Sequence, residues 1–193
     1  MIRLELSGAN TRLHSTLCYQ CPHGMTGCCA SPPGVDWSDI GRIVTLGGGD
    51  WLLAELAAGR LRTGARGLLL KRVENDQTNH GVWPTKCVYH GPQGCTIPPE
   101  HRAATCNYYI CDDAFLFGGE NQDDPDAVAG REAHAVLMAL YGRWDLEFIE
   151  QIADRWSGNP PWDAAFLDWV GAEYTRKVKA SRKDLKSLQA CPR

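Results

Sequence analysis

Eight of the nine cysteines lie in two groups of four, and no other feature of the sequence indicates chemistry as directly. The groups are Cys18, Cys21, Cys28 and Cys29, followed by Cys87, Cys95, Cys106 and Cys111. Thiolates are soft ligands that hold zinc, or the iron of iron–sulfur clusters, in tetrahedral sulfur environments. The grouping therefore predicts a metal site built from these eight residues.

The spacing of the cysteines leaves two cofactors open. Two zinc ions with four thiolates each would use all eight cysteines, as closed structural zinc sites do. Only Cys18 and Cys21 form a C-x2-C pair, however, whereas zinc ribbons usually carry two such pairs. This pair and the C-x4-C pair of Cys106 and Cys111 have spacings that are also found among ferredoxin ligands. We therefore expect an iron–sulfur cluster, 4Fe-4S in type, ahead of Zn2+.

Three other roles for the thiols are alternatives to metal binding. A disulfide framework needs an oxidising compartment, which nothing in the sequence indicates. Inert buried thiols disagree with the polar, turn-forming residues beside the cysteines, such as Gly91-Pro92-Gln93-Gly94. A thiol redox switch or metal carrier would leave some cysteines unbound, and the vicinal Cys28 and Cys29 and the isolated Cys191 are then the reactive candidates.

Other side chains near the cysteines could take part in metal chemistry. His14, His23 and His90 lie close enough in sequence to replace a thiolate, although a histidine in a turn is more often solvated. A metal with an open coordination position would make the protein a metal-dependent enzyme. The candidate helpers are then His90, His101, Arg102 and Tyr108. No catalytic-triad order, H-E-x-x-H or P-loop motif names a reaction.

The order of the cysteines also carries a resemblance to a known family. Cys18-x2-Cys21 precedes the adjacent Cys28-Cys29, and Cys87 precedes Gly94-Cys95-Thr96-Ile97, Arg102-x3-Cys106 and Cys111. This order resembles the YkgJ-type (CxxCxxxCC) family of zinc- or iron-chelating domains, with Ala103 in place of the family's proline. The resemblance covers residues 16–113. It implies metal chelation through the eight cysteines and an accessory role beside enzymes that modify proteins.

Length, charge and hydrophobicity exclude several functional classes. A chain of 193 residues, 44% hydrophobic and 22% charged, suits a globular protein with a real core. The formal net charge of -3 gives no basic footprint for nucleic acid. The apolar runs, such as residues 67–70, are too short for a membrane span, and residues 1–6 lack a signal peptide's apolar segment. We expect a cytoplasmic protein whose partner is another protein rather than a membrane or a nucleic acid.

Local patterns predict an α+β fold in which residues 1–120 form the metal-binding region. The elements expected there are a strand over 3–6, helices over 37–44 and 51–58, a strand over 67–73, a hairpin of strands 87–89 and 95–97, and a short helix between 99 and 111. Asp36 and Asp39 form a capping-box pattern, and Asp50 is placed to cap the second helix. The hairpin would let two thiols converge on one ion, and Tyr108 and Tyr109 would cover the site.

Residues 121–193 are predicted to form a helical region that packs on the first. The expected helices run from Pro125 to about Tyr141, where Gly142 stops the first, then from Asp145 to about 157, and from Asp163 to about 180. Four tryptophans at helical spacing are predicted to lie in the core: Trp144, Trp156, Trp162 and Trp169. The basic run 176–186 suits a solvated helix end as well as it suits contact with an acidic partner or with nucleic acid.

Overall fold

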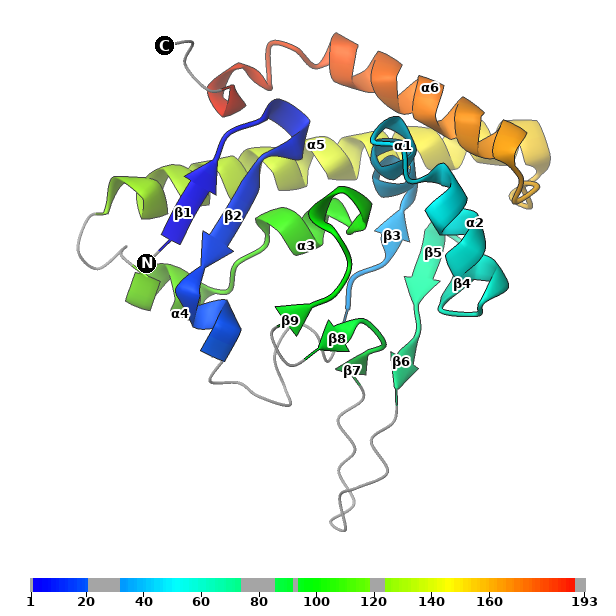
Figure 1. Ribbon diagram of the computed structural model, residues 1–193. Coiled ribbons are helices and arrows are strands. Elements are labelled where there is room, and N and C mark those ends of the chain that lie inside the picture. The colour runs from blue at the N-terminus through cyan, green and yellow to red at the C-terminus, as the bar shows by residue number, and fades with distance from the viewer. Residues whose placement is uncertain (1, 21–31, 74–85, 92–93, 119–123, 190–193) are drawn as a thin grey trace.

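The computed structural model describes residues 2–20, 32–73, 86–91, 94–118 and 124–189 (Figure 1). Within these ranges, helices alternate with short antiparallel strands, so the fold is mixed α and β, as the sequence predicts. None of the helices in the described ranges combines the length and the hydropathy that crossing a membrane requires.

The amino-terminal strands form a hairpin against the longest helix. β1 (Ile2–Glu5) pairs with β2 (Arg12–Ser15), and the 3-10 turn η1 (Gly8–Asn10) joins them, which confirms the strand predicted over 3–6 to within one residue. Ile2 and Leu13 are buried under α5 (Pro125–Trp156). A Cβ on Gly130 of α5 would lie 2.7 Å from Cδ2 of Leu13, so a glycine is needed for this close approach. The 3-10 helix η2 (Thr16–Gln20) follows β2.

A three-stranded sheet and two helices come next. α1 (Trp37–Thr45) begins after Asp36, whose N–H donates to Oδ2 of Asp39 at 3.1 Å, as the capping-box pattern predicts. α2 (Gly49–Ala57) begins one residue before Asp50, so Asp50 lies in its first turn and does not cap it. The sheet has the order β3 (Val35–Asp36), β5 (Gly67–Leu70), β4 (Leu61–Gly64).

The segment that carries the second cysteine group consists of short elements. They are β6 (Arg72–Val73), β7 (Lys86–Cys87), β8 (His90–Gly91), β9 (Gly94–Cys95), the 3-10 helix η5 (Pro99–His101), α3 (Ala104–Tyr108) and α4 (Asp112–Gly118). The single strand predicted over 67–73 is therefore divided, because β5 pairs with β3 and β4 whereas β6 pairs with β7. The predicted turn and short helix between 99 and 111 are present.

The carboxyl-terminal region differs from the prediction at one point. α5 runs without interruption through Gly142, so the predicted stop there and the separate helix from Asp145 are wrong. Gly142 is exposed, and a glycine in a helix costs about 1 kcal/mol relative to alanine. Continuing the helix buries Tyr141 and Trp144 on either side of it, and this burial outweighs that cost. α6 (Ala164–Ala180) begins one residue after the predicted start at Asp163, which is its N-cap, and precedes the 3-10 helix η7 (Lys186–Leu188).

α1 packs against both α5 and α6 and so forms the centre of the molecule (Figure 1). Glycines allow the α1–α6 contact: a Cβ on Gly41 would lie 2.5 Å from Cβ of Tyr174, and one on Gly171 would lie 2.8 Å from Cγ1 of Val44. The buried hydrophobic residues form one core that takes members from both predicted regions. The boundary predicted at residue 120 stays a prediction.

Aromatic side chains fill the end of the core between α1, α5 and α6. Trp144 is buried, as predicted, and the other three tryptophans of this region are partly buried against the core. Trp37 of α1 stacks on Trp162 with ring centroids 5.5 Å apart, and Trp156 meets Trp169 edge to face at 4.7 Å. These contacts join the carboxyl-terminal helices to α1.

Candidate metal-binding site

The structure describes five of the eight predicted ligands and brings three of them to one cavity. Cys87, Cys95 and Cys106 come from β7, β9 and α3, and all three line a cavity of about 110 Å³. Cys18 lies in η2 and Cys111 directly precedes α4, and neither lines this cavity. The remaining predicted ligands, Cys21, Cys28 and Cys29, lie outside the described residues, as do His23 and Cys191.

The three thiols surround the cavity without forming a finished coordination shell. Among the described residues, no three histidine, cysteine, aspartate or glutamate side chains are grouped closely enough to hold a metal ion. Apolar side chains complete the walls, including Leu70, Ile97 and Ala103. Burial raises the pKa of the Cys87 thiol, and the neighbouring Cys95 raises it further.

The strand pairing around the thiols differs from the predicted hairpin. His90–Gly91 pairs with Gly94–Cys95, and Gly94 adopts φ 99°, which suits a glycine at the turn. Cys95 is therefore on a hairpin, as predicted. Cys87 instead pairs with Arg72, because the N–H of Val88 donates to the carbonyl of Lys71 and directs this strand to β6. Two neighbouring strand pairs, rather than the two arms of one hairpin, bring the thiols to the cavity.

Arg102 holds the backbone that carries Cys95. Its Nε donates to the carbonyl oxygen of Ile97 at 2.6 Å, and its Nη2 donates to that of Cys95 at 3.1 Å. Its own carbonyl accepts a hydrogen bond from Arg42 of α1, a guanidinium that is only 2% exposed. These bonds give Arg102 a structural role beside the predicted ligands.

Buried carboxylates of α1 and α5 fix the segment that leads to Cys106. Oδ1 of Asp39 accepts a hydrogen bond from the N–H of Ala104, the first residue of α3, at 2.7 Å. In the first turn of α1, Ser38 is held by Asp145 of α5, whose Oδ1 accepts from both the N–H and the Oγ–H of Ser38, at 2.8 and 2.7 Å. Burial, together with the like charge of Asp145, raises the pKa of Asp39 to about 7, and burial raises that of Asp145 to about 6.

A second polar group supports the wall of the cavity. Tyr89 lines the cavity, and its hydroxyl donates to Oε2 of Glu55 in α2. The same carboxylate accepts from Nε and Nη2 of Arg60, at 2.5 and 2.6 Å. The hydrogen bond from Arg60 lowers the pKa of Glu55, whereas burial and the Glu55 carboxylate raise that of Tyr89. Glu55 thus stays ionised and anchors Tyr89 beside the thiols.

Of the predicted helper residues, His90 lines the cavity. Tyr109, which was predicted to cover the site together with Tyr108, also lines it. Tyr108 is buried, and its ring lies 6.0 Å from that of Tyr141. His101 stacks on Trp51 with a centroid distance of 4.9 Å and does not line the cavity. His14, the remaining described histidine candidate, also lies outside the cavity wall, and its Nε2 is 3.3 Å from Glu5.

The buried charged side chains that support the segment before Cys106 were not predicted from the sequence. Asp39 is recognisable as part of a capping pattern, but its hydrogen bond to Ala104 spans 65 positions and leaves no local signal. Arg42 and Asp145 lie at polar positions of helices, where a solvated side chain is the usual interpretation.

Comparisons with known proteins do not assign the site. No family model, curated protein or solved structure matches this chain. The resemblance to the YkgJ-type family therefore stays a prediction. The functional proposal depends on the cavity and on the order of the cysteines.

Proposed function

We propose that the chain is a metal-binding protein in which Cys87, Cys95 and Cys106 supply thiolate ligands. The observation that carries the proposal is the meeting of three thiols from three separate elements at one cavity of about 110 Å³. Cysteines that serve only as small apolar side chains have no reason to gather in this way. The sequence supplies the remaining donors, because five further cysteines of the same two groups belong to the predicted ligand set.

The donor set favours soft metals, and we propose an iron–sulfur cluster of the 4Fe-4S type, with Zn2+ as the alternative. A bound cluster would supply one-electron chemistry for electron transfer or sensing, whereas zinc would stabilise the fold of an accessory protein. The chain itself contributes an apolar wall that limits the access of water, formed in part by Leu70, Ile97 and Ala103.

Residues outside the ligand set would hold the thiols in place. Arg102 fixes the backbone of Cys95, and Asp39 fixes the first residue of the helix that carries Cys106. Both anchors lead back to α1, which is the most enclosed helix of the core. We propose that α1 is the rigid support against which the thiols are positioned.

Metal analysis of the anaerobically purified protein tests the proposal. We expect iron and sulfide together with visible absorption, and we expect Cys95→Ser and Cys106→Ser each to lower the metal content and the melting temperature. Metal binding contributes on the order of 10 kcal/mol to folding in comparable small sites, so the loss should be large. Cys191→Ser is the matched control, because this cysteine stands apart from both groups, and it should keep its metal.

Two results would change the conclusion. Colourless protein with two zinc ions per chain and neither iron nor sulfide would exclude the iron–sulfur form and retain metal binding. Wild-type protein without metal after purification and reconstitution, or full metal content in both the Cys95 and the Cys106 variants, would show that these thiols are not ligands.

A further inference from the structure

A second cavity, of about 720 Å³, lies at the opposite end of the molecule from β6 to β9 (Figure 1). Four parts of the chain enclose it: η1 with the residue before it, the end of α1, the last turns of α6, and the segment around η7. Its lining residues include Thr45 and Leu46 of α1 and Thr175, Val178 and Lys179 of α6. Its volume is typical of sites for small molecules.

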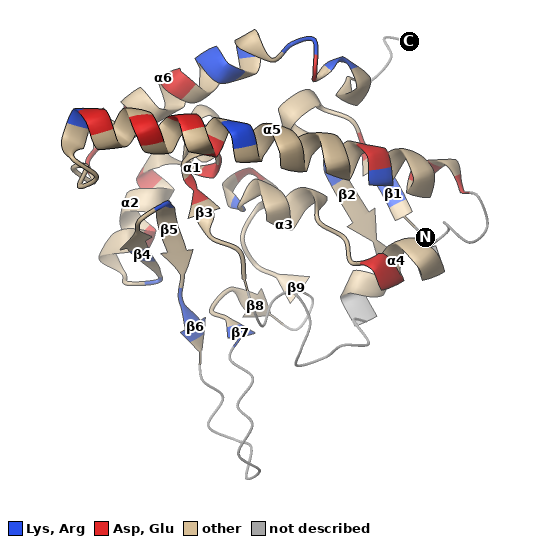
Figure 2. Ribbon diagram, turned by 180° about the vertical axis from the view of Figure 1, so that it is seen from behind, with Lys and Arg blue, Asp and Glu red and all other residues tan. Residues whose placement is uncertain are grey.

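The charged side chains that line this cavity are all positive. Its charged lining residues are Lys179 and Arg182, and no carboxylate lines it. Within the part of the chain that the structure describes, neither cation has a carboxylate partner, whereas the nearby Arg176 and Lys177 are paired with Glu173 and Glu147. Figure 2 shows Lys and Arg residues in the last part of α6 and in the segment that follows. The basic run of the sequence is thus placed at the mouth of a cavity.

Apolar side chains complete the lining of the cavity. Leu46, Val178 and Leu185 are among the lining residues and offer apolar contacts in the same cavity as the two cations.

We propose that this cavity binds a small anionic molecule with an apolar body. Lys179 and Arg182 bind the anionic group, and the apolar side chains contact the body. The concave shape favours a small ligand over a nucleic acid, since a nucleic acid needs an extended basic groove. This site is separate from the cysteine cavity and does not depend on metal.

Calorimetric titration with phenyl phosphate tests the proposal, because this probe combines a phosphate with an aromatic ring. We expect a Kd of about 1 mM or tighter. Inorganic phosphate, which lacks the apolar body, and phenol, which lacks the anion, should both bind more weakly. The double variant Lys179→Gln/Arg182→Gln should lose at least about tenfold in affinity.

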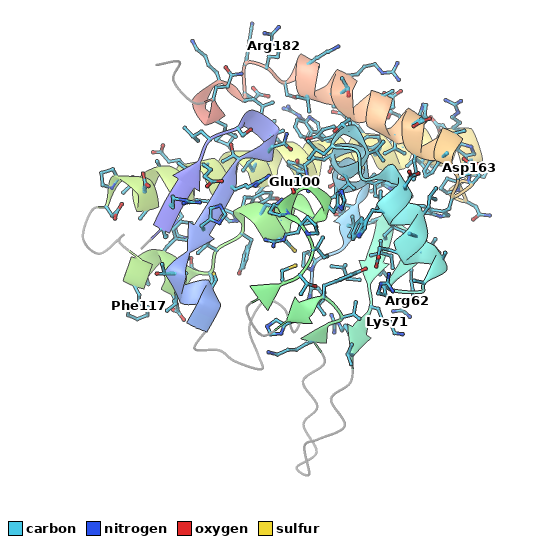
Figure 3. All side chains as sticks on the ribbon, in the orientation of Figure 1. Arg62, Lys71, Glu100, Phe117, Asp163 and Arg182 are labelled. Atoms are coloured by element: carbon cyan, nitrogen blue, oxygen red, sulfur yellow. The ribbon has the colours of Figure 1, made fainter. Side chains whose placement is uncertain are left out.

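The matched control is Arg62→Gln/Lys71→Gln, which removes the same two charges from exposed positions far from Arg182 (Figure 3). It should bind the probe as the wild type does. No binding by the wild type at about 10 mM probe, or equal affinity in the wild type and the Lys179/Arg182 variant, would overturn the proposal. Binding of duplex DNA with steep salt dependence, without binding of the probe, would replace it with a nucleic-acid surface.

Discussion

Replacing Asp39 with asparagine should remove a pH dependence of folding stability between about pH 5 and pH 8. Burial and the like charge of Asp145 raise the pKa of Asp39 from 3.8 to about 7. The unfolded chain restores the ordinary value, so between these pH values the folded protein holds a proton that the unfolded chain has released. Stability from this group is therefore fully present below about pH 4 and is lost as the pH rises through about 7.

The size of the effect follows from the two pKa values. The difference between 3.8 and about 7 corresponds to about 4 kcal/mol in total, and more than half of this change falls between pH 5 and pH 8. Asp145, with a raised pKa of about 6, contributes with the same sign at lower pH. The difference between the wild type and the Asp39 variant reports the Asp39 carboxyl together with its coupling to Asp145, because removing the charge of Asp39 also removes its effect on Asp145.

Urea unfolding at pH 5, 6, 7 and 8 measures this difference directly. At each pH the free energy of unfolding of Asp39→Asn is subtracted from that of the wild type, which also cancels the titration of the thiols. Asp50→Asn, at an exposed position of α2, is the control and should follow the wild type at every pH. A wild-type minus Asp39→Asn difference that stays constant within about 0.5 kcal/mol over this range would refute the reasoning.

Three further substitutions test the packing and the wall of the cysteine cavity. Gly41→Ala should destabilise the fold by about 2 kcal/mol in urea unfolding, because its Cβ would lie 2.5 Å from that of Tyr174. Gly142→Ala, with no atom within 4 Å of the new Cβ, should stabilise by up to about 1 kcal/mol, and equal effects at the two glycines would contradict the observed packing. Tyr89→Phe should lower stability by about 1–2 kcal/mol by removing the donor to Glu55, and an unchanged melting temperature would show that this bond contributes nothing.

Local sequence patterns were sufficient to predict the start of a helix where a single capping residue determines it. Asp36, Asp124 and Asp163 each precede a helix that begins within one residue of where the sequence predicts. Glycine disfavours a helix interior, yet α5 continues through Gly142. It does so because side chains on the next turns contact α1 and α6, which lie far away in the sequence. Helix propensity, which depends on neighbouring residues alone, does not report such a contact.

The metal site stays a prediction. Cys87, Cys95 and Cys106 of the predicted ligand set line one cavity, but no three potential ligands among the described residues lie close enough together to hold a metal ion. The pairing of Cys87 with Arg72 depends on a strand contact across 15 positions. The hydrogen bonds of Asp39 and Arg42 depend on how α1 meets the segment before α3. Such contacts are set by tertiary packing rather than by spacing.

The position of α1 between α5 and α6 has a consequence for the order of events during synthesis. Residues 37–45 leave the ribosome long before residues 164–180, yet Gly41 and Val44 pack closely against Tyr174 and Gly171 of that later helix. Contacts of such wide sequence separation slow folding, and the part of α1 that packs on α6 stays uncovered until α6 has been made. The nascent chain should therefore complete its core, and with it the support for the thiols, in a late and concerted step.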